Sequence, residues 1–492
     1  MGSLFIKDKI WIQFSIIFIL VLIVFFKSLS FEFSWLDNAQ IEEESCIIQS
    51  QQELEDLLFQ PLLNPKGQGN YYRPLFKISY TLDFLLYGKN PLGFRITNIL
   101  LHIFNLILLY VILLKFKIAK EISLLSTLLY GFLPLNTSAV VCLGARADLL
   151  AAFFVLFAFL SYLTFQEKGK AVYFICSLLG YILALMSKEI AFPFFLVIFI
   201  IAKAKNQFKI CNIWYLLLAS GYLFIRFKIF GYIGSSLSLL RGEPFITILS
   251  SFAGFFRYLF KFFMPFNLSL SDAFPKYSSI FNFEVIFGLI LFFMIALFFI
   301  RSVRRENLTL SLFLGWLLFF YIPISNIVPA LHFWAERFFY LPGIGLIGVV
   351  GYLISKRKSL KIPLVAVVLF YGLFNLKYQE YFKNNELLFR RAIDISTKSE
   401  EAYNMLGYHH LLNNDYFRTI YYYHLATQDF SGYYTYSSLD ETCNNLGVVF
   451  LRLKQYKEAR KWFQSAVALD GDDSKAVLNL KILDFIESAD VK

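Results

Sequence analysis

The sequence predicts an all-α protein in which a polytopic bundle of about eleven membrane-spanning helices is followed by a short tetratricopeptide-repeat α-solenoid. Three observations predict this fold class. Of the 492 residues, 58% are hydrophobic and only 16% are charged, whereas a soluble chain is about 25% charged. The apolar residues gather in runs near the length of a bilayer-spanning helix. From Tyr378 onward the composition turns polar and takes the spacing of a helical repeat.

The first apolar run, 10–26, follows Lys7 and Lys9 and is predicted to be an uncleaved membrane anchor. It resembles a signal peptide, but no small-x-small cleavage site follows it. The polar segment 28–95 comes next and forms the predicted first outer loop. The remaining predicted spans crowd together after this loop, at 96–114, 121–134, 148–165, 171–187, 190–202, 212–226, 280–300, 308–324, 338–355 and 362–378.

Basic residues between the apolar runs orient the bundle. They follow each even-numbered span, as cytoplasmic loops require, in clusters at Lys115/Lys117/Lys120, Lys168/Lys170, Lys203/Lys205/Lys209, Arg301/Arg304/Arg305 and Lys356/Arg357/Lys358/Lys361. This agreement holds only when the segment 245–266, which contains Arg257 and Lys261, lies in the interface or re-enters instead of crossing. The +11 net charge therefore reports membrane topology, and we exclude a nucleic-acid partner.

The charge pattern places the N-terminus in the cytoplasm and the first loop on the outer face. The domain after the last span, 379–492, then shares that outer face, and 1–378 forms the membrane domain. In a bacterial inner membrane, which the short form of the repeat domain favours, the outer face is periplasmic.

The C-terminal domain carries one strong repeat and weaker copies. A second copy runs from Leu406 to Ala426, an insertion near 431–434 lengthens its period, and half a repeat precedes it. Such repeats offer a surface to a protein partner. The strong repeat has small residues where two helices approach and large residues in the groove, at Asn445, Leu446, Gly447, Phe450, Ala459, Phe463 and Ala466.

Charged residues beside the predicted spans gather on the outer face, where four loops supply them to one end of the bundle. Charges in such places usually mark function or internal pairing, and this arrangement indicates a cleft for a lipid with an anionic head. Arg146, Lys188 and Arg337 are suited to a phosphate, and Asp37 is suited to accept a proton from a hydroxyl. The supporting polar residues are Arg73, His102, Asp148, Glu189 and Glu336.

The same charged residues could instead have structural roles, as ion pairs or as a solvated surface. Lys188-Glu189 and Glu336-Arg337 also fit ion pairs at helix ends, whereas Arg146 and Asp148, spaced i,i+2, fit a mutual pair poorly. The acidic run 42–44 fits a solvated surface.

A lone helical histidine such as His102 is usually a hydrogen-bonded packing residue. We predict no protein metal site, because the five scattered cysteines form no CxxC pair. A divalent cofactor such as Mg²⁺ or Mn²⁺ stays open.

A series of short motifs runs through nearly the whole chain. They are Tyr72-Arg73-Pro74-Leu75, Gly93-Phe94, Asn98 to His102, Gly144 to Leu150, Ser187-Lys188-Glu189, Pro265 to Leu270, Ser325-Asn326 and Ala335 to Pro342. In order and spacing the series resembles the transmembrane-and-tetratricopeptide-repeat protein O-mannosyltransferases and their bacterial relatives. Each motif is short, and the ordered series is what makes the resemblance specific.

The resemblance implies a GT-C fold glycosyltransferase that moves a sugar from a polyprenyl-phosphate donor to a protein or glycan acceptor. It also implies an acidic base in the first outer loop, the position of Asp37, and phosphate-side roles for Arg146, Lys188 and Arg337. The chain departs from the family at Leu36, where a second acid often stands. It departs again at 133–138, where a His-Pro-x-His-Thr-Glu motif has lost both histidines and the glutamate.

Two other classes compete with the transferase. The lost motif favours a non-catalytic membrane-anchored scaffold, whose repeats recruit partners for envelope glycan or protein assembly. A transporter of lipid-linked or small solutes would show two related halves with midplane charges, and the sequence has no such symmetry. Neither the sugar, the acceptor nor the oligomeric state follows from any pattern in the sequence.

Overall fold

The computed structural model describes residues 10–57, 71–204, 209–230, 243–328, 332–434, 439–469 and 474–490. This part of the chain is almost entirely helical, which confirms the predicted all-α class. The helices are α2 (Ile10–Phe25), α3 (Gln51–Asp56), α4 (Pro74–Tyr87), α5 (Pro91–Lys115), α6 (Lys120–Gly131), α7 (Thr137–Val141), α8 (Arg146–Lys168), α9 (Ala171–Ser187), α10 (Phe194–Ala204), α11 (Ile213–Phe230), α12 (Pro244–Phe263), α13 (Phe283–Arg304), α14 (Leu308–Tyr321), α15 (Tyr340–Ser355), α16 (Lys361–Tyr378), α17 (Asn385–Ile395), α18 (Glu400–Leu412), α19 (Tyr416–Ala426), α20 (Leu439–Arg452), α21 (Tyr456–Leu469) and α22 (Ser474–Asp490).

The chain divides into two compact units. The membrane unit comprises Met1–Leu268 and Tyr277–Lys383, and the repeat unit comprises Ser269–Lys276 and Asn384–Lys492. The repeat unit thus begins slightly later than the boundary at 378/379 that the composition suggests. It also takes in a short segment from between α12 and α13, because strand β1 (Phe274–Pro275) pairs antiparallel with β2 (Tyr433–Tyr434).

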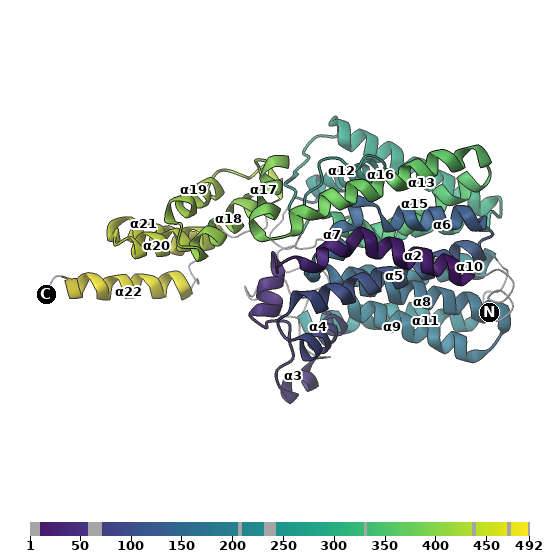
Figure 1. The fold of residues 1–492 in the computed structure, drawn as a ribbon, viewed down its shortest axis with the longest axis horizontal. Coiled ribbons are helices and arrows are strands. Elements are labelled where there is room, and N and C mark those ends of the chain that lie inside the picture. The colour runs from purple at the N-terminus through teal and green to yellow at the C-terminus, as the bar shows by residue number, and fades with distance from the viewer. Residues whose placement is uncertain are drawn as a thin grey trace. The chain divides into compact units, whose positions relative to one another are not determined.

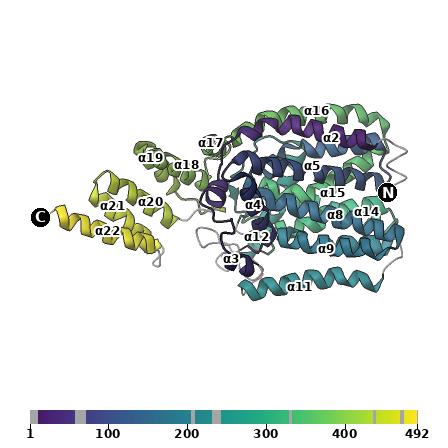
Figure 2. The same cartoon turned by 60° about the horizontal axis from the view of Figure 1, so that its bottom comes forward.

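Most helices of the membrane unit run side by side along one direction (Figures 1 and 2). In the described part, eight helices are long and apolar enough to cross a membrane, or nine when the bent pair α6 and α7 counts as one span. Two shorter apolar helices, Ala171–Ser187 and Leu308–Ile324, join them. Only 11% of the apolar window of α13 is buried, so its side chains need lipid around them. The chain is therefore a multi-pass membrane protein.

Short sequence signals set the ends of several helices. Pro91 begins α5 after Asn90, whose side chain accepts the N–H of Leu92 at 3.1 Å. Gly169 ends α8 with φ +69°, a left-handed conformation that glycine adopts without strain. Pro134 follows α6, and the chain bends there by 51° before α7. The expected span 121–134 thus corresponds to α6, and its continuation into α7 makes the pair either one broken span or a re-entrant loop.

The membrane unit has two distinct ends. Lys115 at the end of α5 lies 2.7 Å from Glu167 near the end of α8, and one groove is lined by both Lys203 of α10 and Arg304 of α13. The predicted cytoplasmic clusters thus meet at one end, which we call the basic end. At the opposite end, which we call the loop end, α5, α8 and α15 begin and α9, α14 and α16 end.

Two segments have helix lengths that differ from those expected of the eleven predicted spans. The expected span 190–202 forms only an 11-residue helix, α10, preceded by the 3₁₀ turn η5 (Glu189–Ala191). A helix of that length rises about 16 Å, yet the segment runs from Lys188 at the loop end to Lys203 at the basic end, as the expected span does. Conversely, 245–266 forms α12, which is long and apolar enough to cross.

Two contacts of α12 lie at the loop end. In the middle of the helix, Ser251 donates to the carbonyl of Ser325, which follows α14. Near its end, Lys261 lies 3.9 Å from Glu336, which precedes α15. A helix rises about 15 Å between those two positions, yet both partners lie at the same end of the unit. Phe252 of α12 also packs against Phe292 and Phe293 of α13, and the orientation of α12 in the interface stays a prediction.

The repeat unit shows the close helix approach that the spacing predicts. In the pair α20 and α21, a Cβ on Gly447 would lie 2.4 Å from the Cδ1 atom of Phe463. In the pair α18 and α19, a Cβ on Gly407 would lie 2.6 Å from the same atom of Tyr423. The two pairs are therefore equivalent repeats in which only glycine fits at the crossing.

Candidate functional site

The first loop is anchored at the loop end by a buried arginine and a small apolar core. Arg95, one turn into α5, donates to the carbonyls of Phe31 at 3.3 Å, Glu32 and Val141. A buried guanidinium needs such partners, so these bonds tie the loop to the segment before α8. The core packs side chains of the loop against α4, α5 and α8, through Phe33, Ile41, Cys46, Ile47, Phe76, Tyr80, Phe94, Leu143 and Ala147.

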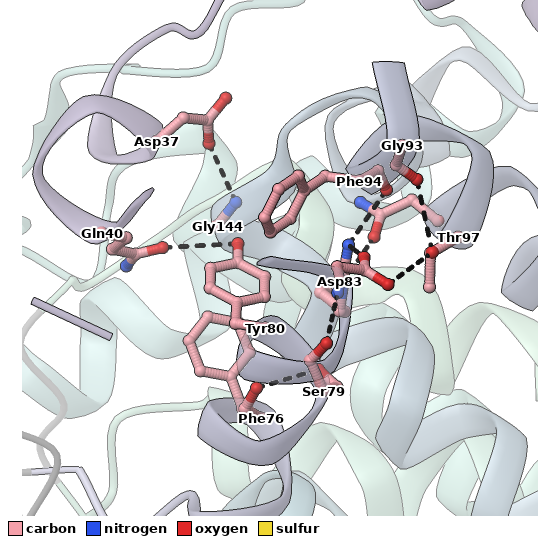
Figure 3. A network of polar contacts seen from close by, with 12 residues as sticks. Asp37, Gln40, Phe76, Ser79, Tyr80, Asp83, Gly93, Phe94, Thr97 and Gly144 are labelled. Carbon is pink, nitrogen blue, oxygen red and sulfur yellow. Dashed lines mark hydrogen bonds and ion pairs between the residues drawn. The ribbon is translucent and has the colours of Figure 1, made fainter. Parts of the chain in front are cut away.

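Asp37 lies in this loop and is fully buried. Its Oδ1 atom accepts the N–H of Gly144 at 3.0 Å, and its Oδ2 atom accepts that of Ser34 at 3.3 Å; Figure 3 shows the first of these bonds. Burial raises the pKa of Asp37 to about 6, although the charge of Arg95 and the two N–H groups lower it. A carboxylate has about four lone-pair sites, so Asp37 keeps the capacity to accept a proton.

Arg146 lies beside Asp37 but is enclosed by protein. Its guanidinium pairs with Asp83 at 2.6 Å and donates to the Oδ1 atom of Asn98 at 2.7 Å. It also donates to the carbonyls of Ser79 at 3.2 Å and Phe94 at 3.0 Å, and its side chain has no exposed surface. These surroundings favour a structural role over the phosphate contact that the sequence predicts.

Asp83, the buried partner of Arg146, is a residue that the sequence did not single out (Figure 3). It lies in α4, where it is the only acid between Pro74 and Tyr87, and it accepts from the hydroxyl of Thr97 at 2.9 Å. A single acid within an apolar helix beside a membrane is the signal that could have identified it.

Two ion pairs connect α4, α8 and the turn after α9. Lys188 lies 2.6 Å from Asp148 and Arg73 lies 2.7 Å from Glu189, so Lys188 and Glu189 each pair across the fold and not with each other. Burial lowers the pKa of Lys188 to about 8, and Asp148 opposes this effect. Burial raises the pKa of Glu189, but Arg73, Arg226 and Lys188 outweigh it and hold it at about 2. Arg226, at the end of α11, is a further cation that the sequence reasoning missed.

Arg337 differs from the other arginines of the site. It is only 7% exposed, and in the described part of the chain its guanidinium contacts aromatic rings instead of hydrogen-bond acceptors. It lies 4.7 Å from the ring centroid of Trp35 and 5.0 Å from that of Phe338. The ammonium of Lys188 lies 4.6 Å from the same Phe338 ring. Trp35 is two residues before Asp37, so Arg337 links the loop of Asp37 with Lys188.

These contacts define a group of buried cations that share the carboxylates Asp148 and Glu189. Such a group of cations attracts an anion, and the Arg fork matches the geometry of a phosphate. We call the group the cation cluster, and its members are Arg73, Lys188, Arg226 and Arg337.

Glu336 and His102 have partners that explain their burial. Glu336 accepts from the hydroxyl of Tyr378 at 2.8 Å, besides its contact with α12. The Nε2 atom of His102 lies 3.1 Å from the carbonyl of Gly131, which only accepts, so Nε2 carries the proton. Its Nδ1 atom then accepts from the hydroxyl of Tyr340 at 2.7 Å. His102 is thus a hydrogen-bonded core residue, the reading that its position in a helix favours.

The acids of the site do not fit a divalent metal. Among the described residues, no group of three or more His, Cys, Asp or Glu side chains could hold a metal ion. The acids nearest the cation cluster are each engaged by a cation. We therefore derive no step through a metal.

Comparisons with known proteins find a repeat model and several relatives that resemble this chain. A model named tetratricopeptide repeat matches residues 440–473, which confirms the strong repeat. Mouse protein O-mannosyl-transferase TMTC4 is 25% identical over 465 residues, which cover 78% of this chain and 62% of the relative. The human protein of that name is 25% identical over 409 residues, covering 68% of this chain and 55% of the relative.

A shorter stretch of this chain has a higher identity to another relative. Mouse protein O-mannosyl-transferase TMTC1 is 36% identical over 101 residues, 20% of this chain and 11% of that relative. The chain thus spans less than two thirds of the length of these relatives. No solved structure matches it. Over most of its length the chain is thus similar to protein O-mannosyl-transferases, and this confirms the resemblance that its ordered motifs predict.

Proposed function

We propose that the protein is a membrane glycosyltransferase of the GT-C type that moves a sugar from a polyprenyl-phosphate donor to an acceptor hydroxyl. The relatives are named protein O-mannosyl-transferases, so we propose mannose as the sugar and a protein hydroxyl as the acceptor. The observation that carries the proposal is a buried carboxylate, Asp37, whose loop also supplies the ring that contacts Arg337.

The proposed reaction has one displacement step. Arg337 and Lys188 bind the donor phosphate, and Asp37 accepts the proton of the acceptor hydroxyl. The hydroxyl oxygen bonds to the anomeric carbon while the bond from that carbon to the phosphate oxygen breaks, and polyprenyl phosphate leaves with the electron pair. Attack opposite the leaving group inverts the anomeric centre. The cation cluster stabilises the charge that develops on the phosphate, and the base contributes roughly 10²–10⁴-fold.

The orientation in the membrane belongs to the same proposal. The basic clusters meet at one end of the membrane unit and Asp37 lies at the other, which supports a cytoplasmic basic end. The loop end would then face the periplasm of a bacterial inner membrane, together with the repeats. The relatives named above are animal proteins, and in a eukaryotic secretory membrane the loop end would be lumenal.

The pH dependence of transfer tests the proposal. We expect the purified full-length chain to consume labelled polyprenyl-phosphate mannose in the presence of acceptor peptides. Because Asp37 accepts a proton only when ionised, and its pKa is raised to about 6, kcat/KM should rise from pH 5 to pH 7 and then level off. The measurement is the rate of loss of the lipid-linked label at each pH.

Two outcomes would argue against the proposal. No loss of label with any acceptor tested would favour the non-catalytic scaffold, whose repeats should instead retain partner proteins. Transfer with a flat profile from pH 5 to pH 7 would keep the enzyme but remove Asp37 from the role of base.

A second prediction concerns Arg337. The Arg337→Gln variant should raise the KM for the lipid-linked donor roughly 10- to 100-fold, because a hydrogen bond to a charged group contributes about 1.5–3 kcal/mol. The kcat value should change less. Steady-state kinetics over a range of donor concentrations measure this effect.

The matched control is Lys89→Gln, which removes a cation of the first loop whose partner is Glu44 at 2.7 Å. It should leave the donor KM within twofold of the unmodified protein. If Arg337→Gln lowers the thermal stability and leaves the donor KM unchanged, Arg337 is a packing residue and not a phosphate ligand.

A further inference from the structure

A groove lies at the basic end of the membrane unit between α10 and α13. Helix α14 packs against both helices and forms its floor. A Cβ on Gly315, in the middle of α14, would lie 2.6 Å from the Cδ1 atom of Ile200 in α10 and 3.0 Å from the Cε2 atom of Phe299 in α13. The cavity has a volume of about 650 Å³, within the roughly 300–1,000 Å³ of ligand pockets.

The lining of the groove is apolar along the helices and charged at one end. Phe199 and Ile300 line its walls, and Ile300 is 46% exposed, so this wall opens toward lipid. Lys203 and Arg304, at the ends of α10 and α13, line the groove where it reaches the membrane surface. Glu306 is the one acid among the described lining residues, so the mouth carries net positive charge.

We propose that this groove binds one anionic phospholipid. An acyl chain covers the apolar walls, and Lys203 and Arg304 contact the headgroup phosphate. A free phosphate would satisfy the two cations but leave the walls uncovered, whereas a lipid satisfies both. Arg301 and Arg305 flank the mouth in sequence and add to the attraction for an anionic headgroup.

The site is separate from the proposed transfer reaction. Lys203 and Arg304 lie at the basic end, while Asp37 and the cation cluster lie at the loop end of the same unit. The lipid site therefore does not depend on whether Asp37 acts as a base, and a test of binding does not require activity.

Native mass spectrometry of the purified full-length protein tests the proposal. Phosphatidylglycerol is titrated as the anionic probe and phosphatidylcholine of the same acyl chains as the neutral one. We expect one phosphatidylglycerol to bind saturably and more tightly than phosphatidylcholine. The double variant Lys203→Gln/Arg304→Gln should bind phosphatidylglycerol roughly tenfold more weakly, because each cation near an anionic headgroup contributes about 1 kcal/mol or less.

Two further variants make the result decisive. Lys168→Gln/Lys170→Gln removes the same charge elsewhere at the basic end and should leave the affinity within twofold. Val303→Trp fills the groove and should weaken both lipids. Equal loss in the two double variants would mean nonspecific attraction, and equal affinity for both headgroups would remove the role of Lys203 and Arg304; either result overturns the proposal. Phosphate alone competing fully with the lipid would indicate a plain anion site instead.

Discussion

Replacing Asp37 with Asn should lower the kcat of sugar transfer roughly 10²–10⁴-fold, the usual contribution of a positioned general base. The amide has almost the same shape as the carboxylate, so it still accepts the N–H of Gly144 through its oxygen. It cannot take the proton of the acceptor hydroxyl. The donor KM should stay within about threefold, because the phosphate contacts proposed for Arg337 and Lys188 are untouched. The measurement is the rate of loss of labelled lipid-linked mannose at pH 7.

The control for this variant is Glu43→Gln in the same loop. Glu43 is exposed, and the variant removes one negative charge, as Asp37→Asn does. It should retain full turnover and the acid limb of the pH profile. Transfer by Asp37→Asn at the rate of Glu43→Gln would refute the assignment of the base. Loss of folded protein on size-exclusion chromatography would instead show that the two backbone bonds of Asp37 hold the loop.

Replacing Arg146 with Met should lower the free energy of unfolding by about 3–5 kcal/mol, because it leaves the carboxylate of Asp83 buried without its cation. The guanidinium lies 2.6 Å from Asp83 and has no exposed surface. The variant also removes the bond to Asn98. The expected result is a large drop in the Tm of the full-length protein in detergent micelles. Intrinsic fluorescence during heating measures this Tm.

Two comparisons separate this structural role from the phosphate role that the sequence assigns to Arg146. The double variant Arg146→Met/Asp83→Leu should recover much of the lost Tm, because apolar residues often replace a buried ion pair at little cost. Arg257→Gln, whose pair with Glu284 is partly exposed, should change stability by about 1 kcal/mol or less. If Arg146→Met keeps its Tm and raises the donor KM, Arg146 binds the donor.

The order of elements along the chain could be predicted because the signals are local. Apolar runs show where most membrane helices lie, and a regular spacing shows where two repeat helices meet at Gly447 and Phe463. The length of α10 was harder to predict: the helix has only 11 residues, because Pro193 and the turn η5 shorten it inside a continuous apolar run.

The partners of the site residues could not be predicted in the same way. The sequence leaves open a pair between the neighbours Lys188 and Glu189. In the structure Lys188 reaches Asp148, 40 residues away, and Glu189 reaches Arg73, 116 residues away. Which helices pack together decides these pairs, and hydropathy and periodicity carry no information about it.

By itself, the sequence therefore determined an all-α membrane protein with a tetratricopeptide repeat and an acid in its first loop. Only the tertiary structure decided what surrounds that acid. In the structure, Asp37 is buried and accepts a hydrogen bond from Gly144. Arg146 pairs with Asp83, and Arg337 contacts two aromatic rings. The physical reason is that a buried charge must find its partner in three dimensions, whereas the composition of a helix is set within the helix itself.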